Sequence, residues 1–462
     1  MTSPWFCPVP SKRPEVAWPG IWPYLIIYVV IQAITALIVI DAWPKGKPAG
    51  TFDFYMTLLF PAAYASFVVL SLFYYFSFER PAWRTYAWNN LCEERECYWH
   101  RWAQKCVAVV GSVVLAAEED IAERMLGLEG SAPTNPDKIL PLKLAVPAGT
   151  SQLAHVLGLL LQPLVQTVKP LQRAGNLRVV LQTEREADLE ELQRVMRKLE
   201  LSPSNLLWDS GKDPASVRHL WRDDKALSGS LLVLACQLHE GKMEPDCSEL
   251  ALALLVCHPD VLGRTKPHGY WYRPISADAD ELDTALTTLL RAGQTPPKRL
   301  KHFWFSGLDK RMRHAVTTAV SDTELNLGIQ DIDRCLGKAG HVSQWLPAAL
   351  AAQMHHHGQG AQLIATPGNP GATLHVVAPQ VAGPAYASAP QIFGMMWAVT
   401  LIALAAGAFM LDLFQVKGNT DDMFMAWWAY PLITVVLIAL GVIAEGLSLG
   451  GMYQDFWERY GW

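Results

Sequence analysis

Four long runs without a charged residue constrain this chain more than any other feature of its sequence. They are Ile21–Ile40, Phe54–Phe76, Ile392–Leu411 and Met423–Ala444, and each is closed by a charged residue within three positions. A helix needs roughly 20 apolar residues to cross the hydrocarbon core of a bilayer, and in lipid the backbone must be hydrogen-bonded within the segment. The alternative is buried helices of a soluble core, but those keep a polar face. The runs therefore predict four transmembrane helices in two hairpins.

Aromatic residues flank the first and last runs, as is typical of helix ends at a membrane surface. They include Trp18, Trp22, Trp43, Trp427, Trp428 and Trp457. The first run is longer than the apolar core of a signal peptide and a second run follows closely, so we expect no cleavage. The runs lack the ionisable residues that transporters keep at mid-depth, which favours an anchor over a conduction path.

Lysine and arginine indicate the orientation. Lys12 and Arg13 lie in the N-terminal tail, five basic residues follow the second run between Arg80 and Lys105, and the two short loops hold three. The positive-inside rule places both termini and the long central segment in the cytoplasm. Seven of the eight cysteines lie between Cys92 and Cys335, where a reducing compartment would leave them as free thiols.

These boundaries divide the chain into five parts. They are a tail of residues 1–20, a transmembrane hairpin 21–78, a cytosolic domain 79–390, a second hairpin 391–446 and a tail 447–462. The charged fraction is 18% and the net charge is -5, so the chain has no basic excess with which to bind nucleic acid. We therefore expect the lipid bilayer as one partner and no nucleic acid.

The central domain alternates strand-like and helix-like patterns, which predicts an α/β domain with a mixed sheet. Strands are expected at Leu177–Leu181, Ser230–Leu234, Leu252–Val256 and His302–Phe305, with a hairpin over Gln362–Val377. Helices are expected at Val107–Leu126, Asp188–Leu199, Leu282–Leu290, Met312–Val320 and Trp345–Met354. No short-period repeat is visible.

The stretch Lys301–Pro379 resembles the C-terminal half of a thiolase or ketosynthase. It contains a strand, a helix, the segment Gly-Lys-Ala-Gly-His at Gly337–His341, a further helix and a closing hairpin. The resemblance implies a thiolase-like fold and assigns Lys338 and His341 to the positions of the family's lysine and Gly-His pair. These two residues are three apart, closer than in the family.

The resemblance also implies a cysteine nucleophile and a second histidine. The nearest cysteine is Cys236, which lacks the small neighbours of a nucleophile turn, and Ser306–Asp309 holds no histidine where the family has one. The sequence thus predicts a pseudo-enzyme without catalytic residues. The alternative is a catalytic set of Cys236, Lys338 and His341, with the cysteine as nucleophile and the histidine as base.

The whole layout resembles proteobacterial membrane proteins encoded beside type VI secretion effectors, and the segment Leu336–Ala351 between two membrane pairs carries that resemblance. It implies a non-enzymatic protein of the bacterial inner membrane that binds a secretion effector, as an immunity protein or a loading adaptor. The alternative is a membrane-tethered acyl-transfer enzyme of thiolase-like fold.

Two groups of residues suggest metal binding without supporting it. Cys92, Cys97, His100 and Cys106 provide four nitrogen or sulfur ligands for zinc, but their spacing fits no standard pattern. His355–His357 point in three directions on a helix. The sequence also lacks nucleotide-binding glycine motifs, so we expect no metal and no cofactor.

Ala403 and Gly407 are four residues apart in the third run. Such a pair of small residues lets helix backbones approach closely. The third run is therefore expected to pack tightly within the protein or against a second copy, as in a homo-oligomer.

Overall fold

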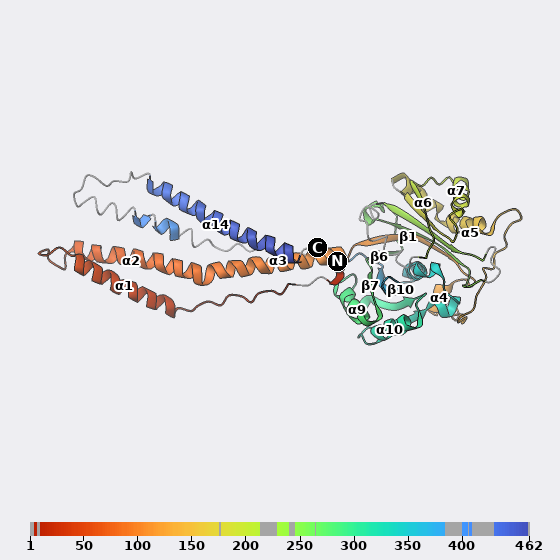
Figure 1. The fold of residues 1–462 in the computed structure, drawn as a ribbon, viewed down its shortest axis with the longest axis horizontal. Coiled ribbons are helices and arrows are strands. Elements are labelled where there is room, and N and C mark those ends of the chain that lie inside the picture. The colour runs from red at the N-terminus through yellow and green to blue at the C-terminus, as the bar shows by residue number, and fades with distance from the viewer. Residues whose placement is uncertain are drawn as a thin grey trace. The chain divides into compact units, whose positions relative to one another are not determined.

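The computed structural model describes residues 4–6, 10–174, 177–212, 229–239, 245–263, 265–383, 400–404, 406–408 and 429–460. The chain forms two compact units, one of residues 1–98 and 386–462 and the other of residues 99–385. We describe each unit separately (Figure 1).

The first unit is helical. Its elements are α1 (Trp22–Ala42), α2 (Phe52–Tyr74), the π-helical turn η2 (Tyr75–Glu79), α3 (Arg80–Ala103, whose end enters the second unit) and α14 (Ala429–Tyr460). The α1–α2 hairpin carries a polar contact, because Gln32 Nε2 donates to Ser66 Oγ at 2.9 Å. Small polar contacts of this kind hold helices together in lipid.

Two helical segments in the described part are long and apolar enough to cross a membrane, Trp22–Ala42 and Ala62–Ala103. The predicted anchor of four spanning helices is therefore supported for its first hairpin only. The third run lies mostly outside the described residues. Of the fourth run, the described part is helical from Ala429, and this helix continues past the predicted end of the span to Tyr460. Gly407 lies against the ring of Tyr64 in α2, within the same chain.

The second unit is a large mixed α/β domain, as the sequence predicts. Its strands are β1 (Cys106–Leu115), β2 (Leu177–Gln182), β3 (Asn205–Asp209), β4 (Ser230–Gln237), β5 (Leu250–Cys257), β6 (Gly269–Tyr272), β7 (Ile275–Ala277), β8 (Leu300–Phe305), β9 (Gly328–Asp331), β10 (Ala361–Pro367) and β11 (Ala372–Ala378). Its helices are α4 (Ile121–Met125), α5 (Gln152–Leu161), α6 (Val165–Ala174), α7 (Asp188–Lys198), α9 (Leu282–Arg291), α10 (Lys310–Ser321), α11 (Ile332–Leu336) and α12 (Leu346–Met354).

The strands lie in the order β3-β2-β4-β5-β1-β6-β11-β10-β8-β9, with β7 beside β11. This order contains the same arrangement twice. In each half the second strand is parallel to the third and fourth, the fifth is antiparallel to the fourth, and the first is antiparallel to the fifth. In the second half the first strand is split into β6 and β7 around Arg273 and Pro274, since proline cannot donate to the ladder.

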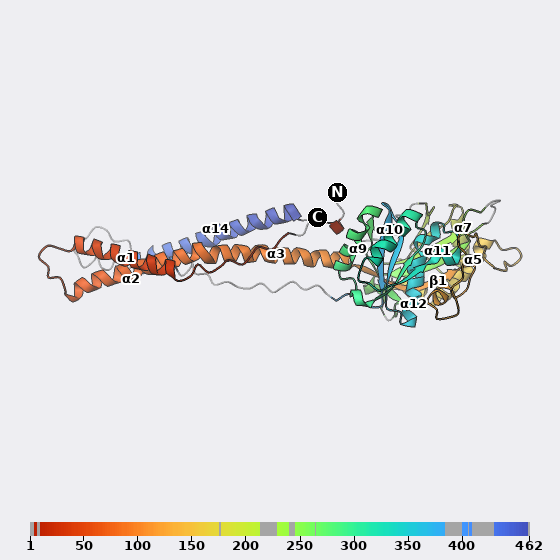
Figure 2. The ribbon, with the colours of Figure 1, turned by 90° about the horizontal axis from the view of Figure 1, so that it is seen from below.

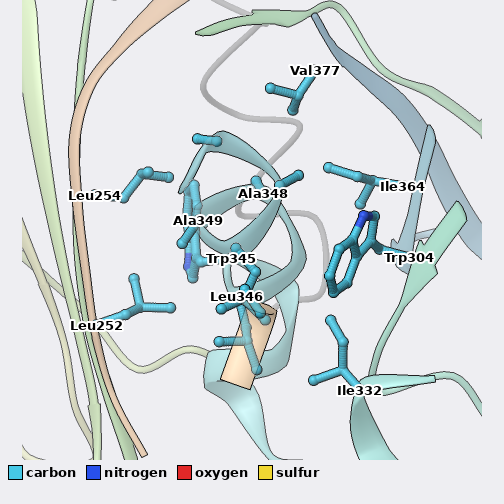
Figure 3. Close-up of a cluster of buried hydrophobic side chains, with 14 of the residues drawn as sticks. Leu252, Leu254, Trp304, Ile332, Trp345, Leu346, Ala348, Ala349, Ile364 and Val377 are labelled. Carbon is cyan, nitrogen blue, oxygen red and sulfur yellow. The ribbon is translucent and has the colours of Figure 1, made fainter. Parts of the chain in front are cut away.

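Helix α12 lies between the two halves (Figure 3). Eight of its nine residues are buried. It contacts Leu252 and Leu254 of β5 on one side, and Trp304 of β8 and Ile364 of β10 on the other. Its run of alanines lets both half-sheets approach closely. Helices α5, α6 and α7 cover the outer face of the first half, and α9 and α10 that of the second (Figures 1 and 2).

Most predicted elements are confirmed, including α7, α9, α10, α12 and the β10–β11 hairpin. The helix predicted over Val107–Leu126 is wrong, because Cys106–Leu115 is the central strand β1 and only Ile121–Met125 is helical. Five valines stand in β1. Their β-branched side chains are restricted in helices and pack well on a pleated surface.

Candidate active site

A cavity of about 620 Å³ opens where loops from both halves of the α/β domain meet. Part of its lining comes from residues at or just after the ends of parallel strands. Gly211 and Lys212 follow β3, Gly307–Asp309 follow β8, and Asp331 and Pro367 end β9 and β10. The carboxyl ends of parallel strands are the usual position of ligand sites in α/β folds.

The Gly337–His341 segment forms one wall of the cavity. The Lys338 backbone fixes it, because its N–H donates to the Lys138 carbonyl at 2.8 Å and its carbonyl accepts from Ser248 N–H at 2.9 Å. Gly337 has a φ of +83°, and a Cβ there would collide with the Lys138 carbonyl. The glycine is therefore required by the path of the backbone. The Lys338 side chain is exposed at the cavity.

His341 begins the short helix η8 (His341–Gln344), which leads into α12. Its ring lies against Gly211, so that a Cβ on Gly211 would stand 2.7 Å from His341 Cδ2. A chain of hydrogen bonds fixes the same loop. Trp345 Nε1 donates to Gln182 Oε1 at 3.0 Å, Gln182 Nε2 donates to Asp209 Oδ2 at 3.0 Å, and Gly211 N–H donates to Asp209 Oδ1 at 3.1 Å. The histidine of one half is thus positioned against the other half.

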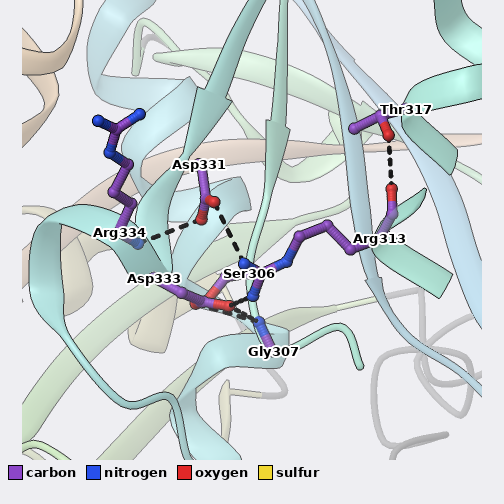
Figure 4. A network of polar contacts seen from close by, with 7 residues as sticks. All are labelled: Ser306, Gly307, Arg313, Thr317, Asp331, Asp333 and Arg334. Atoms are coloured by element: carbon purple, nitrogen blue, oxygen red, sulfur yellow. Dashed lines mark hydrogen bonds and ion pairs between the residues drawn. The ribbon is translucent and has the colours of Figure 1, made fainter. Parts of the chain in front are cut away.

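A polar network forms another wall (Figure 4). Asp333 accepts hydrogen bonds from Ser306 Oγ at 2.6 Å and from Gly307 N–H at 2.9 Å, and it pairs with Arg313 at 3.3 Å. Arg313 also pairs with Asp331 at 3.4 Å. Burial raises the pKa of Asp333, although the hydrogen bonds from Ser306 and Gly307 oppose that shift. The network includes Ser306 and Gly307, from the segment where the resembling family has its second histidine.

Cys236 does not reach this cavity. It lies on β4, and its side chain belongs to the apolar cluster under α5 and α7. Gln237, the next residue, approaches Gly340. Successive side chains of a strand point to opposite faces, so Cys236 faces away from the wall that holds Lys338 and His341. Burial raises the pKa of the Cys236 thiol to about 12. The structure brings Lys338 and His341 together and separates Cys236 from both.

Beside Lys338, the cavity has two cationic residues that the sequence analysis missed, Lys212 and Arg334. Lys212, Arg334 and Lys338 line it and are exposed. Arg313 is paired with two carboxylates, whereas Lys212, Arg334 and Lys338 form no ion pair with another residue in the described part. Lys212 follows β3 and Arg334 lies in α11, close after the end of β9, and this position after a strand is the sequence signal that could have found them. Four aspartates also line the cavity, Asp137, Asp309, Asp331 and Asp333, so its formal charge is balanced. The three cations without an ion-pair partner in the described part can still contact an anionic ligand.

The candidate metal ligands have other surroundings. Cys92, Cys97 and His100 lie on α3, and Cys106 begins β1. His355 bonds to the His268 carbonyl at 3.0 Å, whereas His357 lies 3.4 Å from Glu123. Within the ranges that the structure describes, no group of three or more metal-ligating side chains is arranged to hold an ion.

Comparisons with known proteins give similarity to solved structures alone. No family model matches the chain, and no curated protein does. A type II polyketide acyl-carrier protein in complex with its ketosynthase is 10% identical, covering 59% of this chain and 98% of that chain at a TM-score of 0.43. An oxazolomycin ketosynthase domain from Streptomyces albus is 11% identical. The match covers 63% of this chain and 100% of that chain at a TM-score of 0.42. OleA from Xanthomonas campestris is 14% identical. The match covers 59% of this chain and 99% of that chain at a TM-score of 0.39.

The similar solved structures bear on the prediction that the protein is not an enzyme. The sequence predicts a protein that is not an enzyme, whereas the solved structures to which the α/β domain is similar are of ketosynthases and OleA. The prediction that the protein is not an enzyme is corrected to this extent: the fold to which the domain is similar is one that enzymes have. That prediction was based largely on Cys236, which the fold places in the core, so Cys236 gives no information about the chemistry of the cavity.

Proposed function

We propose that this protein is a membrane-tethered enzyme that transfers an acyl group, and that the reaction takes place in the cavity lined by Lys338 and His341. One observation carries the proposal. His341 lines the same cavity as Lys212, Arg334 and Lys338, at the carboxyl ends of parallel strands, and these three cations form no ion pair in the described part. Cations without an ion-pair partner suit a donor with an anionic group, and a histidine suits proton transfer near neutral pH.

The proposed reaction does not pass through Cys236. A thiolate is the reactive form of cysteine, and a thiol with a pKa of about 12 is almost entirely protonated at neutral pH. We propose direct transfer from an acyl thioester to an acceptor. The acceptor's nucleophile attacks the thioester carbonyl while its proton moves to His341. As the carbon–sulfur bond breaks, the donor thiolate leaves and takes that proton.

The cations have separate roles in this proposal. Lys338 lies three residues from His341 in the same wall and stabilises the oxyanion that forms on the attacked carbonyl. Lys212, on the loop after β3, and Arg334, on α11 of the other half, hold the anionic part of the donor. Asp333 and Arg313 neutralise each other and position the loop that holds Gly307.

The full chain in detergent tests the proposal. A panel of acyl-coenzyme A thioesters is supplied with amine and alcohol acceptors, and release of free thiol is measured. His341→Gln is expected to lower turnover by about 10²–10⁴-fold, while Cys236→Ala retains it. His314→Gln is the control, because His314 is exposed on α10 and does not line the cavity. Equal turnover of the His341 and His314 variants, or loss with Cys236→Ala, contradicts the mechanism.

The tether and its surroundings are part of the same proposal. Helix α1 and the helical segment Ala62–Ala103 are long and apolar enough to cross a membrane. We propose that they anchor the protein in the bacterial inner membrane, with the α/β domain in the cytoplasm. Binding of a type VI secretion effector stays a prediction from the sequence resemblance, which co-purification from cells that express the chain would test.

A further inference from the structure

A second cavity, of about 480 Å³, lies in the helical unit between α3, α14 and the N-terminal tail. Arg84 and Trp88 of α3 and Asp455 and Arg459 of α14 line it, together with Arg13 of the tail. The spacing of Arg84 and Trp88, and of Asp455 and Arg459, is four residues, so each pair occupies one face of its helix. The cavity thus has three guanidinium groups and one carboxylate.

The tail that supplies Arg13 is docked on α3. Trp88 Nε1 donates to the Ser11 carbonyl at 3.0 Å, and Asn89 exchanges hydrogen bonds with the Arg13 backbone at 2.7 and 3.0 Å. Lys12 pairs with Glu93 at 2.7 Å. The Arg13 guanidinium lies 4.3 Å from the centre of the Trp88 ring. This stacking leaves the edge of the guanidinium, with its donors, available to a ligand.

Helix α14 is held against α3 by apolar packing and hydrogen bonds. Phe456 is fully buried against Leu91 and Cys92. Arg95 Nε donates to the Tyr460 carbonyl at 2.5 Å, and Arg84 donates to Ser448 Oγ. The cavity walls are thus fixed, and no carboxylate in the described part forms an ion pair with Arg13, Arg84 or Arg459.

The position of the cavity relative to the membrane span indicates the class of ligand, a lipid headgroup. Glu79 is the first charged residue after the apolar run Phe54–Phe76. A helix rises about 1.5 Å per residue, so Arg84 stands about 8 Å beyond Glu79. The polar headgroup layer is about 5–8 Å thick on each side of the hydrocarbon core. Leu447 and Met452 line the same cavity and offer an apolar surface to the start of an acyl chain.

We propose that this cavity binds the phosphate headgroup of an anionic phospholipid. Guanidinium groups match phosphate in geometry and charge, and basic pockets at the cytoplasmic ends of membrane helices suit anionic headgroups. The site is separate from the cavity of the α/β domain. It would give the anchor a preference for anionic lipid, through residues that take no part in acyl transfer.

The experiment measures lipid retained by the full chain in nonionic detergent, by native mass spectrometry. Dioleoyl phosphatidylglycerol is the probe and dioleoyl phosphatidylcholine the zwitterionic control. The wild-type protein is expected to retain the anionic lipid preferentially. Arg84→Gln and Arg459→Gln should each lower its affinity about five-fold, which is the effect of about 1 kcal/mol per basic residue.

Two controls separate the effect of these arginines from a general effect of charge and from misfolding. Lys45→Gln with Lys47→Gln removes two charges from the loop at the other end of the α1–α2 hairpin and should leave retention unchanged. Arg84→Lys keeps the charge and should retain more lipid than Arg84→Gln if the glutamine variant is correctly folded. Equal retention of both lipids, or unchanged retention in the double variant Arg84→Gln and Arg459→Gln, overturns the proposal. Displacement of the lipid by millimolar sn-glycerol 3-phosphate also overturns it, since the site would then take a soluble phosphate.

Discussion

Replacing Gly211 with alanine should separate the geometry of the proposed active site from the stability of the fold. Gly211 has a φ of +67°, and a Cβ there would lie 2.7 Å from His341 Cδ2 and 2.9 Å from Cγ. The chain offers a matched control in Gly358, which has a φ of +69° and open space around a Cβ. Both substitutions place an alanine in the left-handed region, and only one of them meets the histidine.

The expected magnitudes follow from this difference. An alanine in the left-handed region costs about 1–2 kcal/mol, and about 1 kcal/mol lowers the melting temperature of a large domain by about 2–4 °C. Gly211→Ala must in addition push the imidazole by roughly 1 Å to restore an ordinary contact, and a misplacement of this size can reduce turnover about 10²-fold.

Thermal unfolding and thiol release are measured on the full chain in detergent for both variants. Gly358→Ala should lose stability and keep its turnover per folded molecule, whereas Gly211→Ala should lose more stability and most of its turnover. If the two variants have the same melting temperature and the same turnover, the position of His341 against Gly211 does not matter and the reasoning fails.

Three further predictions concern the core. Burial lowers the pKa of His375 from the ordinary value of 6.5 to about 3. Between these two pH values the unfolded chain takes up a proton that the folded protein does not. The free energy of unfolding should therefore fall by up to about 1.4 kcal/mol for each unit by which the pH drops in this range. In His375→Gln, denaturant titrations at several pH values should lack that component, and an unchanged pH dependence would contradict it. Leu350→Ala, in the centre of α12, should destabilise the domain by about 2–5 kcal/mol, against less than about 0.5 kcal/mol for the exposed control Leu207→Ala. Because the Cys236 thiol is buried and its pKa is about 12, iodoacetamide should label it only after denaturation, and rapid labelling of the native protein would show that the cavity reaches it.

Local patterns in the sequence predict most elements of the α/β domain, because amphipathic stripes and turn residues report on nearest neighbours. The stripe in Asp188–Leu199 corresponds to α7, and the Pro-Gly-Asn-Pro-Gly segment forms the β10–β11 turn. The pattern fails at β1, where an apolar run is buried on a central strand and has no periodicity to distinguish it from a helix.

The candidate site shows a different limit. The Gly337–His341 segment is identifiable because two glycines stand beside a lysine and a histidine, and in the structure Gly337 has a positive φ. Its counterpart, Gly211–Lys212, is far away in the sequence and becomes part of the site only through the contact of Gly211 with His341. The same limit applies to the alternative in which Cys236 is the nucleophile. Residue type indicates a nucleophile, but the face of β4 on which it lies depends on strand register.

The duplicated strand order explains why the site lies where it does. Each half has a parallel second and third strand, and the loop after the third strand leaves at the same place in both. In the first half this loop carries Gly211 and Lys212, and in the second the segment after β9 carries Asp333, Arg334 and, beyond α11, His341. A site formed by equivalent loops requires both halves to be in register. The helix that follows the second loop is α12, which packs against both half-sheets. Truncating Leu350 in α12 should therefore disturb turnover as well as stability, whereas a variant of equal cost on the outer face of one half, such as Leu192→Ala in α7, should change stability alone.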